Sequence, residues 1–297
     1  MNILCVGLLT LDITQTVTAL PGPNEKTVAL STSVDFGGPA ANAAASASIL
    51  GSDVTLASLA SKNAVSALAL AQFKSYGGDF ISLVHTLDEA NTYESGTDVP
   101  IATIMVTKNT GERAVVSGYP SVPKDYIFPG KIPDFDVLLL DGHNLIAAKQ
   151  TAKVANERGA LVVLDGGSWK VGLEELLPLV DIAILSADFR APEGYKIPCK
   201  YVAISNGGDP ITVLSPTPAT VPVPKSKIVD TLGAGDVLHG AFAHFIVGKE
   251  ITFDAFIDAL SNAAAIASAS CEHSGALGWK ADYYIKDQKY LREDEDE

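Results

Sequence analysis

Two aspartates enclose a run of small residues in the segment Asp230-Thr231-Leu232-Gly233-Ala234-Gly235-Asp236. Small residues at positions 233–235 let the backbone approach a ligand closely, and the helical sequence that follows turns its free N–H groups toward the same place. The run therefore predicts an anion cradle. In phosphoryl transfer a carboxylate accepts the proton of the attacking hydroxyl, and Asp236 could serve as that base. Capping of the helix would also explain an aspartate in its first turn.

A second glycine-containing run begins at Gly37-Gly38 and leads into an alanine-rich helical stretch that carries Asn42 in its early turns. An amide side chain both donates and accepts hydrogen bonds, which suits a polyhydroxy ligand. A tight turn that packs a helix against a sheet explains the same glycines equally well. Both interpretations stay open for this motif in isolation.

Near-continuous apolar runs recur along the chain and alternate with helix-length stretches such as 147–158, which Gly159 closes. Such runs are typical of strands buried on both faces of a parallel sheet, and the alternation predicts βαβ units with helices on both faces. Ligands bind beyond the carboxyl ends of these strands, so the polar residues there are candidates for a site. The polar residues that end three of the runs are Asp141, Asp165 and Ser186.

Two segments, about 12–35 and 96–118, break this alternation and predict a small β-sheet that lies over the main one as a lid. In the first segment, residues 26–30 form a β-branched piece after a turn. The second holds a hairpin pattern across Asn109-Thr110-Gly111. Arg113 follows that turn and could reach a substrate, although a solvated arginine is the ordinary outcome at such a position.

Composition narrows the function further. The formal net charge of −14 argues against nucleic-acid binding, which needs clustered cations. No apolar run reaches the roughly 18 to 20 residues of a membrane span, and no leader pattern opens the chain, so we expect a soluble, cytoplasmic protein. The three cysteines lack metal-type spacing and predict neither a disulfide nor a zinc site. The acidic end, residues 287–297, is expected to be poorly ordered.

The chain resembles the ribokinase-like (PfkB) carbohydrate kinases. The resemblance is carried by Gly37-Gly38 with Asn42, and by Asp230 to Asp236 continuing as Val-Leu-His-Gly-Ala-Phe, with about 190 residues between the two motifs. It covers essentially the whole chain and implies one ribokinase-like domain, 1–297: a three-layer α/β/α fold with a mostly parallel central sheet and a small β-sheet lid. It also implies an ATP- and Mg²⁺-dependent phosphotransferase that acts on an alcohol group of a sugar.

The resemblance also implies roles for single residues. Asp236 is similar to the family's catalytic base, and Gly233, Ala234 and Gly235 to its anion hole. The candidates for substrate binding are Asp12, Gly37, Gly38, Asn42 and the hairpin residue Arg113. The residues that match nucleotide-pocket positions are Ser186, Asp188, Ser205, Gly207, Gly208 and Asn262. Those that match a monovalent-cation site, for K⁺, are Asp230, Leu232 and Ser274.

Some positions depart from the family pattern. Many members carry Asn-x-x-Glu, linked to magnesium and phosphate, where this chain has Ser186-Ala187-Asp188-Phe189. Ketohexokinase-like members also show Ser-x-Asp there, so the magnesium ligands stay open. Ribokinases proper tend to have lysine where Pro39 stands, which weakens an assignment to ribose. Lys170 follows a strand end and could extend toward phosphates.

Three functions remain in view: a sugar kinase, a kinase of a nucleoside or vitamin-like alcohol, and a non-catalytic sugar or nucleotide sensor on the same fold. Residues 13–34 contain no Phe, Tyr or Trp to stack on a nucleobase, which favours a sugar. A sensor would have lost its base, whereas Asp236 is present. We also expect a homodimer formed through the lid sheet, because lid strands present open edges. The sequence does not identify the sugar.

Overall fold

The structure, a computed structural model, describes residues 1–83, 99–118, 128, 130–281 and 283. The acidic end 287–297 and the first three residues of the predicted lid segment 96–118 lie outside the described residues. The elements in chain order are β1 (Asn2–Val6), β2 (Thr10–Val17), β3 (Ser31–Gly37), α1 (Pro39–Ile49), β4 (Asp53–Ser58), α2 (Ala64–Lys74), β5 (Asp79–Ser82), β6 (Ile101–Thr107), β7 (Arg113–Ser117), β8 (Val137–Leu140), α3 (Leu145–Arg158), β9 (Leu161–Gly166), α4 (Leu173–Leu176), the 3-10 helix η1 (Leu177–Leu179), β10 (Ile182–Ser186), β11 (Tyr201–Asn206), β12 (Asp209–Ser215), β13 (Ala219–Val221), α5 (Ala234–Ile246) and α6 (Phe253–Ser270).

The main sheet has nine strands within the described residues, in the order β13-β12-β11-β10-β9-β8-β1-β4-β5. Every neighbouring pair from β11 to β5 is parallel, and β12 and β13 add an antiparallel edge. The predicted, mostly parallel central sheet is therefore confirmed. The carboxyl ends of β8, β9, β10 and β11 lie side by side, which brings the polar residues that end them to one edge.

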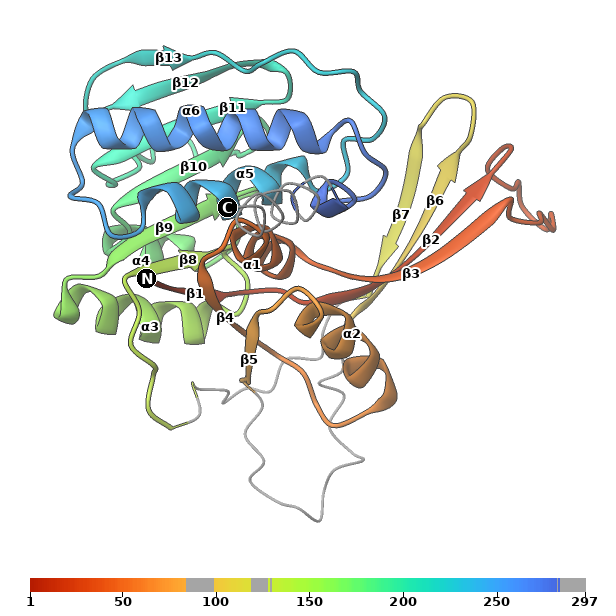
Figure 1. The fold of residues 1–297 in the computed structure, drawn as a ribbon, viewed down its shortest axis with the longest axis horizontal. Helices are drawn as coiled ribbons and strands as arrows, with labels where there is room; N and C mark the ends of the chain where they lie inside the picture. Colours follow the sequence, from red (N-terminus) through yellow and green to blue (C-terminus); the bar gives the residue numbers. More distant parts are fainter. Residues whose placement is uncertain (84–98, 119–127, 129, 282, 284–297) are drawn as a thin grey trace, which may run out of the picture.

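Helices cover both faces of this sheet, as Figure 1 shows. Alternate side chains of one strand point to opposite faces, and β1 illustrates the consequence. Ile3 and Cys5 belong to the core that packs under α1, α5 and α6, whereas Leu4 and Val6 belong to the core that packs under α3 and α4. Both faces of β1 are thus buried, as the near-continuous apolar run predicts, and the three-layer α/β/α fold is confirmed.

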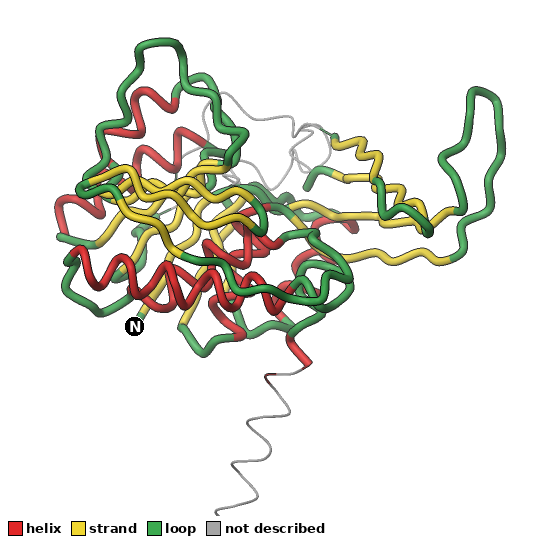
Figure 2. The backbone as a smooth tube through the Cα atoms, turned by 90° about the horizontal axis from the view of Figure 1, so that it is seen from above, coloured by secondary structure: helices red, strands yellow, loops and turns green. Residues whose placement is uncertain are grey.

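The second sheet has the order β3-β2-β6-β7 and extends away from the main body (Figures 1 and 2). Its outer pairs are antiparallel, and the central pair β2–β6 is parallel. The hairpin of β6 and β7 forms as predicted. The piece at 26–30 is not a strand, because the ladder between β2 and β3 begins with Thr16 opposite Ser31 and leaves the intervening residues as a connecting loop.

Two further features concern the whole of the described chain. No helix within it combines the length and the apolarity that crossing a lipid bilayer requires. The three cysteines, Cys5, Cys199 and Cys271, are buried free thiols.

Candidate active site

A cavity of about 520 Å³ lies where the second sheet meets the N-terminal ends of α1 and α5. The sequence candidates among its lining residues are Asp12, Gly38, Asn42, Arg113, Asp230, Leu232, Gly233, Asp236 and Ser274. These residues come from both ends of the chain and from the lid hairpin. The structure therefore brings the two glycine motifs and the lid together around one space, which is large enough for a small molecule.

The residues predicted to form an anion cradle, Gly233 to Gly235, lie at the start of α5. Gly233 is the residue before the helix and has a φ of 72°, in the left-handed region that favours glycine. A Cβ at this position would also overlap the side chain of Ala276. The backbone amides of Gly235 and Asp236 have no acceptor among the described residues, as expected for the free N–H groups of a helix start. These amides and the helix dipole can bind an anion.

Asp236 is partly buried at the same helix start. Burial raises the pKa of its carboxyl to about 7, and the nearby charges of Asp165 and Asp141 act in the same direction. A hydrogen bond from Asn42 and the charge of His239 oppose that rise in pKa. Both protonation states are therefore populated near neutral pH, where a general base is most effective.

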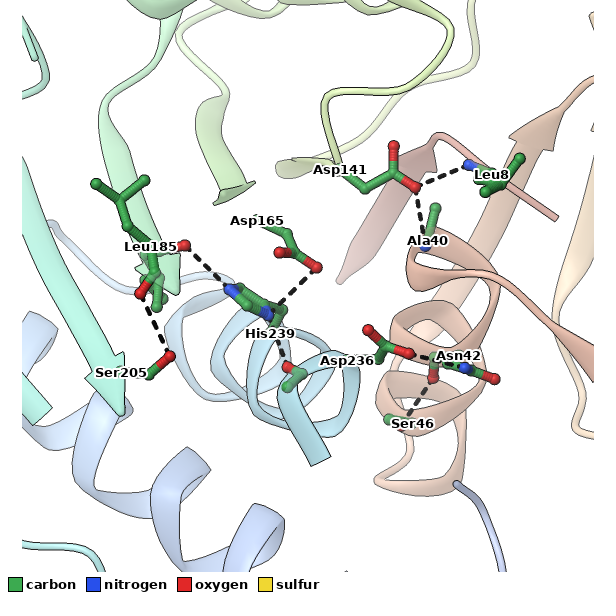
Figure 3. A network of polar contacts seen from close by, with 12 residues as sticks. Leu8, Ala40, Asn42, Ser46, Asp141, Asp165, Leu185, Ser205, Asp236 and His239 are labelled. Atoms are coloured by element: carbon green, nitrogen blue, oxygen red, sulfur yellow. Dashed lines mark hydrogen bonds and ion pairs between the residues drawn. The ribbon is translucent and has the colours of Figure 1, made fainter. Parts of the chain in front are cut away.

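Asn42 holds one oxygen of this carboxylate. Its Nδ2 donates a hydrogen bond of 2.8 Å to Oδ2 of Asp236, while its Oδ1 is buried without a described partner (Figure 3). The residue is only 7% exposed and lies in the second turn of α1. Gly38 precedes this helix with a φ of 96°, and a Cβ there would overlap the carbonyl oxygen of Leu8. The glycine thus lets α1 begin close to β1, which places Asn42 beside Asp236.

Gly37 has a different role. A Cβ at this position would overlap the carboxylate of Asp12, so the glycine leaves room for that side chain in the cavity wall. Asp12 lies directly opposite Asp35 in the β2–β3 ladder. Burial raises the pKa of Asp12, and the charge of Asp35 adds to the rise, while a hydrogen bond from Thr10 opposes it. Like charges directly opposite each other destabilise a sheet, so this pair favours a ligand that donates hydrogen bonds between them.

Sequence analysis missed several lining residues, including Asp35 and Gln72. Nε2 of Gln72, in α2, donates 2.6 Å to the carbonyl oxygen of Val34, and its Oε1 is buried without a described partner. Asp35 could have been found only if the register of β2 and β3 had been known, because that register places it directly opposite Asp12. No pattern in α2 marks Gln72, because its place in the wall depends on the packing of α2 against β3.

Two aromatic residues also line the cavity, from outside the segment 13–34 that the sequence analysis considered. The ring of Phe36 packs edge-on against that of Tyr76, with 5.4 Å between their centroids. Nζ of Lys280 lies 3.8 Å from the centroid of Tyr76. Phe36 is almost fully buried. The aromatic surface open to a ligand is therefore limited to part of Tyr76.

Asp230 joins two loops at the edge of the cavity. Its Oδ1 accepts a hydrogen bond of 2.9 Å from the amide of Leu232, and its Oδ2 accepts one of 2.9 Å from the amide of Gly275. Ser274 lies next to this junction and lines the cavity. The three residues predicted for a monovalent cation are therefore close together, and the carboxylate already fixes the backbone around them.

The residues predicted for the nucleotide lie outside the cavity lining: Ser186, Asp188, Ser205, Gly207, Gly208 and Asn262. Ser186 and Ser205 are opposite each other at the carboxyl ends of β10 and β11. Asp188 is exposed, and its nearest cation is Arg190, at 3.9 Å. Asn262 donates 2.8 Å to the carbonyl oxygen of Asp258 within its own helix.

Asp141 and Lys170 lie behind the site. Oδ2 of Asp141 accepts hydrogen bonds from the amides of Leu8 and Ala40, at 2.8 and 3.1 Å, and therefore ties β1 to the start of α1 (Figure 3). Nζ of Lys170 donates 3.3 Å to the carbonyl oxygen of Asp141 and does not line the cavity. Asp141 thus supports the turn that carries Asn42.

Comparisons with known proteins concern the family and the fold of this chain. The sequence model of a family described as pfkB family carbohydrate kinase matches residues 1–188 and 193–280. Similar solved structures include a ribokinase from Thermotoga maritima, 20% identical with a TM-score of 0.70, covering 96% of this chain and 99% of that one. A ribokinase from Arabidopsis thaliana complexed with ribose and ATP is 20% identical, with a TM-score of 0.69 and coverages of 93% and 94%. A nucleoside kinase from Methanocaldococcus jannaschii is 18% identical, with a TM-score of 0.71 and coverages of 96% and 98%.

Proposed function

This chain belongs to the pfkB family of carbohydrate kinases, which transfer phosphate to an alcohol group, and on that premise we propose that it phosphorylates a hydroxyl of a sugar at the expense of ATP. The observation that carries the proposal is the position of Asp236. It lies at the start of a helix with free amides, in the wall of a cavity lined with hydrogen-bond acceptors. A purely structural role for Asp236 would not require a helix start, free amides and a cavity wall at the same place.

In this proposal Asp236 is the general base. Asn42 occupies its Oδ2, which fixes the plane of the carboxylate and leaves Oδ1 for the hydroxyl of the substrate. The pKa of about 7 makes the carboxylate a stronger proton acceptor than an exposed aspartate while keeping a large fraction ionised at neutral pH. The hydroxyl loses its proton to Asp236 as its oxygen attacks the γ-phosphorus, and the bond from that phosphorus to the β–γ bridging oxygen breaks, so that ADP leaves.

Gly233, Ala234 and Gly235 are proposed to bind the transferred phosphoryl group. The free amides of Gly235 and Asp236 are the proposed donors to the phosphoryl oxygens, on which charge grows, and the helix dipole adds to their effect. The position of Gly235 has open space where a Cβ would lie, so a phosphate can come close to the backbone. The donor set therefore fits the terminal phosphate of ATP. The nucleoside part is assigned to Ser186, Asp188, Ser205, Gly207, Gly208 and Asn262.

Magnesium is proposed to arrive with the ATP phosphates. The described residues contain no group of three or more His, Cys, Asp or Glu side chains placed to hold a metal ion. Mg²⁺ commonly binds through substrate phosphates with few protein ligands and several waters, so such a group is not required. When bound, the ion neutralises charge on the phosphates.

The polarity of the cavity supports a polyhydroxy substrate without a phosphate of its own. The carboxylates of Asp12 and Asp35 and the unpartnered amide oxygens of Asn42 and Gln72 are all acceptors. Sugar hydroxyls can donate to each of them, whereas a phosphorylated sugar would bring negative charge toward them. Arg113 is the one cation that lines the cavity within the described chain.

A nucleoside or vitamin-like alcohol is the second candidate, and the aromatic lining is the observation that favours it. Tyr76 offers a ring at the cavity wall. Lys280 lies against that ring, however, and Phe36 is almost fully buried, so little stacking surface remains for a nucleobase. A non-catalytic sensor is a weaker candidate, because the base and the cradle are both in place.

A monovalent cation, K⁺, is proposed beside Asp230, Leu232 and Ser274, where it would support the loop that leads into the cradle. Asp230 already links this loop to Gly275 through two backbone hydrogen bonds. An ion bound there would act on the position of the cradle and not on the substrate. The rate of ATP consumption in K⁺ and in Na⁺ at equal ionic strength tests this assignment, and equal rates would reject it.

A homodimer through the second sheet and a cytoplasmic location complete the proposal. β3 and β7 are the edge strands of that sheet, and Val115 and Val116 of β7 expose more than half of their surface. Open edges with apolar side chains favour pairing with a second copy. Sedimentation at micromolar concentration distinguishes dimer from monomer. The three buried free thiols suit a reducing compartment.

The decisive experiment replaces Asp236 by Asn, with Asp254→Asn as the matched control. Both aspartates lie in the first turn of a helix, but Asp254 is exposed and outside the cavity. We expect Asp236→Asn to lower kcat by about 10²–10⁴-fold with ATP and sugar binding retained, and Asp254→Asn to leave kcat unchanged. A panel of pentoses, hexoses, ketoses, sugar acids and nucleosides supplies the acceptors. Near-normal turnover by Asp236→Asn on every accepted substrate would reject the mechanism.

A further inference from the structure

His239 is buried in α5 and contacts three separate parts of the chain. The residue is only 4% exposed. Nδ1 lies 2.6 Å from the carbonyl oxygen of Gly235 in the anion cradle, and Nε2 lies 3.1 Å from the carbonyl oxygen of Ile184 in β10. Oδ2 of Asp165, in β9, lies 3.3 Å from Nδ1 (Figure 3). One side chain therefore links two strands of the main sheet to the first turn of α5.

The partners of the two ring nitrogens decide which form of the ring fits. A backbone carbonyl only accepts hydrogen bonds, and both nitrogens face one. A neutral imidazole carries a single N–H, so one of its nitrogens would turn a lone pair toward a carbonyl oxygen in a dry environment. The imidazolium donates at both positions. We propose that His239 is a buried imidazolium, and that it is a positioning residue for the cradle and for Asp236.

The charges around the ring support this assignment. Asp165 is buried beside it and supplies the opposite charge; burial raises the pKa of Asp165, and His239 is the strongest influence against that rise. Asp141 from the end of β8, and Asp236 on the same helix, add further negative charge nearby. His143 and Lys170 are the other ionisable groups that act on Asp165. A positive ring at this place balances a predominantly acidic cluster.

The ring has two consequences for Asp236. Its hydrogen bond to Gly235 fixes the peptide next to Asp236, and thus the direction of the cradle amides. The charge of Asp165 raises the proton affinity of Asp236, and the charge of the ring counteracts that effect. Removing the ring would therefore leave the first turn of α5 less constrained and expose Asp236 to an unbalanced carboxylate. This second part rests on the proposed function, because it concerns the base of the reaction.

Nitrogen-15 spectra of histidine-labelled wild-type protein test the first part without any assay of activity. The signals of His239 are identified by their disappearance in His239→Asn. We expect protons on both ring nitrogens from about pH 6 to about pH 8, a range in which an exposed histidine loses its charge. Asp165→Asn should remove one of these protons. One unprotonated ring nitrogen in the wild type throughout that range would overturn the assignment, whether or not the chain is a sugar kinase.

The pH profile of kcat/KM tests the positioning role. We expect the acid limb of this profile to lie about one pH unit higher in His239→Asn than in the wild type, because the variant lacks a cation near the carboxyl of Asp236. The control is His244→Asn, in the same helix, whose ring binds Ser52 away from the cavity; its limb should not move. A lower rate with an unmoved limb would show a merely structural role and overturn this part. If His239→Asn does not fold, the same limb in His239→Gln decides: an unmoved limb there also overturns it.

Discussion

The side-chain amide of Asn42 donates a hydrogen bond of 2.8 Å to Oδ2 of Asp236, and the two residues are separated by 194 positions in the sequence. This bond joins α1 to α5, so the two glycine motifs form one site. Gly38 is needed for the close approach of α1 to β1, and that approach is what brings an amide to the proposed base.

The first prediction concerns this bond. Asn42→Ala should move the acid limb of kcat/KM to higher pH, because the hydrogen bond from Asn42 lowers the pKa of Asp236 and the variant loses it. We expect a loss of about tenfold or more in kcat/KM at neutral pH, and partial recovery at alkaline pH. Steady-state rates at a series of pH values measure both.

The control for Asn42→Ala is Ser48→Ala in the same helix, whose hydroxyl donates to the carbonyl oxygen of Tyr76 and does not line the cavity. Its pH profile should match that of the wild type. If Asn42→Ala loses activity equally at all pH values, Asn42 acts on the substrate alone and not on the base.

Most of the fold could be predicted from the sequence because the central strands of the main sheet, such as β1, β8 and β9, are buried on both faces. Such strands are apolar throughout, and the alternation of these runs with helices leaves few other topologies. The second sheet was harder, since its strands are partly exposed and carry little pattern. The error at 26–30 arose because β-branched residues in an exposed loop resemble those of a strand.

The site could be predicted only where the backbone itself constrains the residue type. Gly37, Gly38 and Gly233 leave a signal because a side chain would collide with a neighbour or require a rare backbone conformation. Gln72 and Asp35 leave none, because any polar residue suits their local structure and their place in the cavity depends on tertiary packing. His239 could not be assigned for the same reason, since its partners come from two other strands.

The second prediction links Asp236 to stability. Its pKa in the folded protein is about 7, above the ordinary carboxyl value of 3.8, so ionisation is penalised in the fold. The stabilising contribution of the protonated form is fully present below about pH 4 and is lost as the pH rises through about 7. Asp236→Asn removes this loss, and should raise the free energy of unfolding at pH 8 by about 1–3 kcal/mol.

Urea unfolding at about pH 4 and at pH 8 measures this effect, with the difference between variant and wild type expected only at the higher pH. Asp254→Asn serves as the control, because it weakens a favourable charge at the start of α6 and should lower stability by about 0.3–1 kcal/mol. Equal stability of Asp236→Asn and wild type at pH 8 would contradict the raised pKa.

The third prediction compares two glycines with the same φ of 72°, Gly233 and Gly159. A Cβ at Gly159 would meet nothing within 4 Å, whereas one at Gly233 would overlap Ala276. Gly159→Ala should therefore cost about 1 kcal/mol of stability from backbone strain alone, with activity intact. Gly233→Ala should cost more and should reduce kcat, because the cradle must shift. Equal losses of stability and activity in the two variants would show that the cradle tolerates this displacement.

The fourth prediction concerns the substrate side of the cavity. Oε1 of Gln72 is buried and unpartnered, while Nε2 is held by the carbonyl oxygen of Val34, so the amide is oriented to accept a hydrogen bond from a ligand. Gln72→Ala should raise KM for the sugar by about tenfold, the value of one hydrogen bond, with KM for ATP and kcat nearly unchanged.

Lys74→Ala is the matched control for Gln72→Ala, because Lys74 lies in the same helix but is exposed and outside the cavity. Its KM values should equal those of the wild type. Sugars that lack one hydroxyl each extend the test: the analogue whose KM is the same in wild type and Gln72→Ala lacks the hydroxyl that donates to Gln72. If every analogue keeps the tenfold difference, Gln72 supports the wall of the cavity and does not contact the sugar.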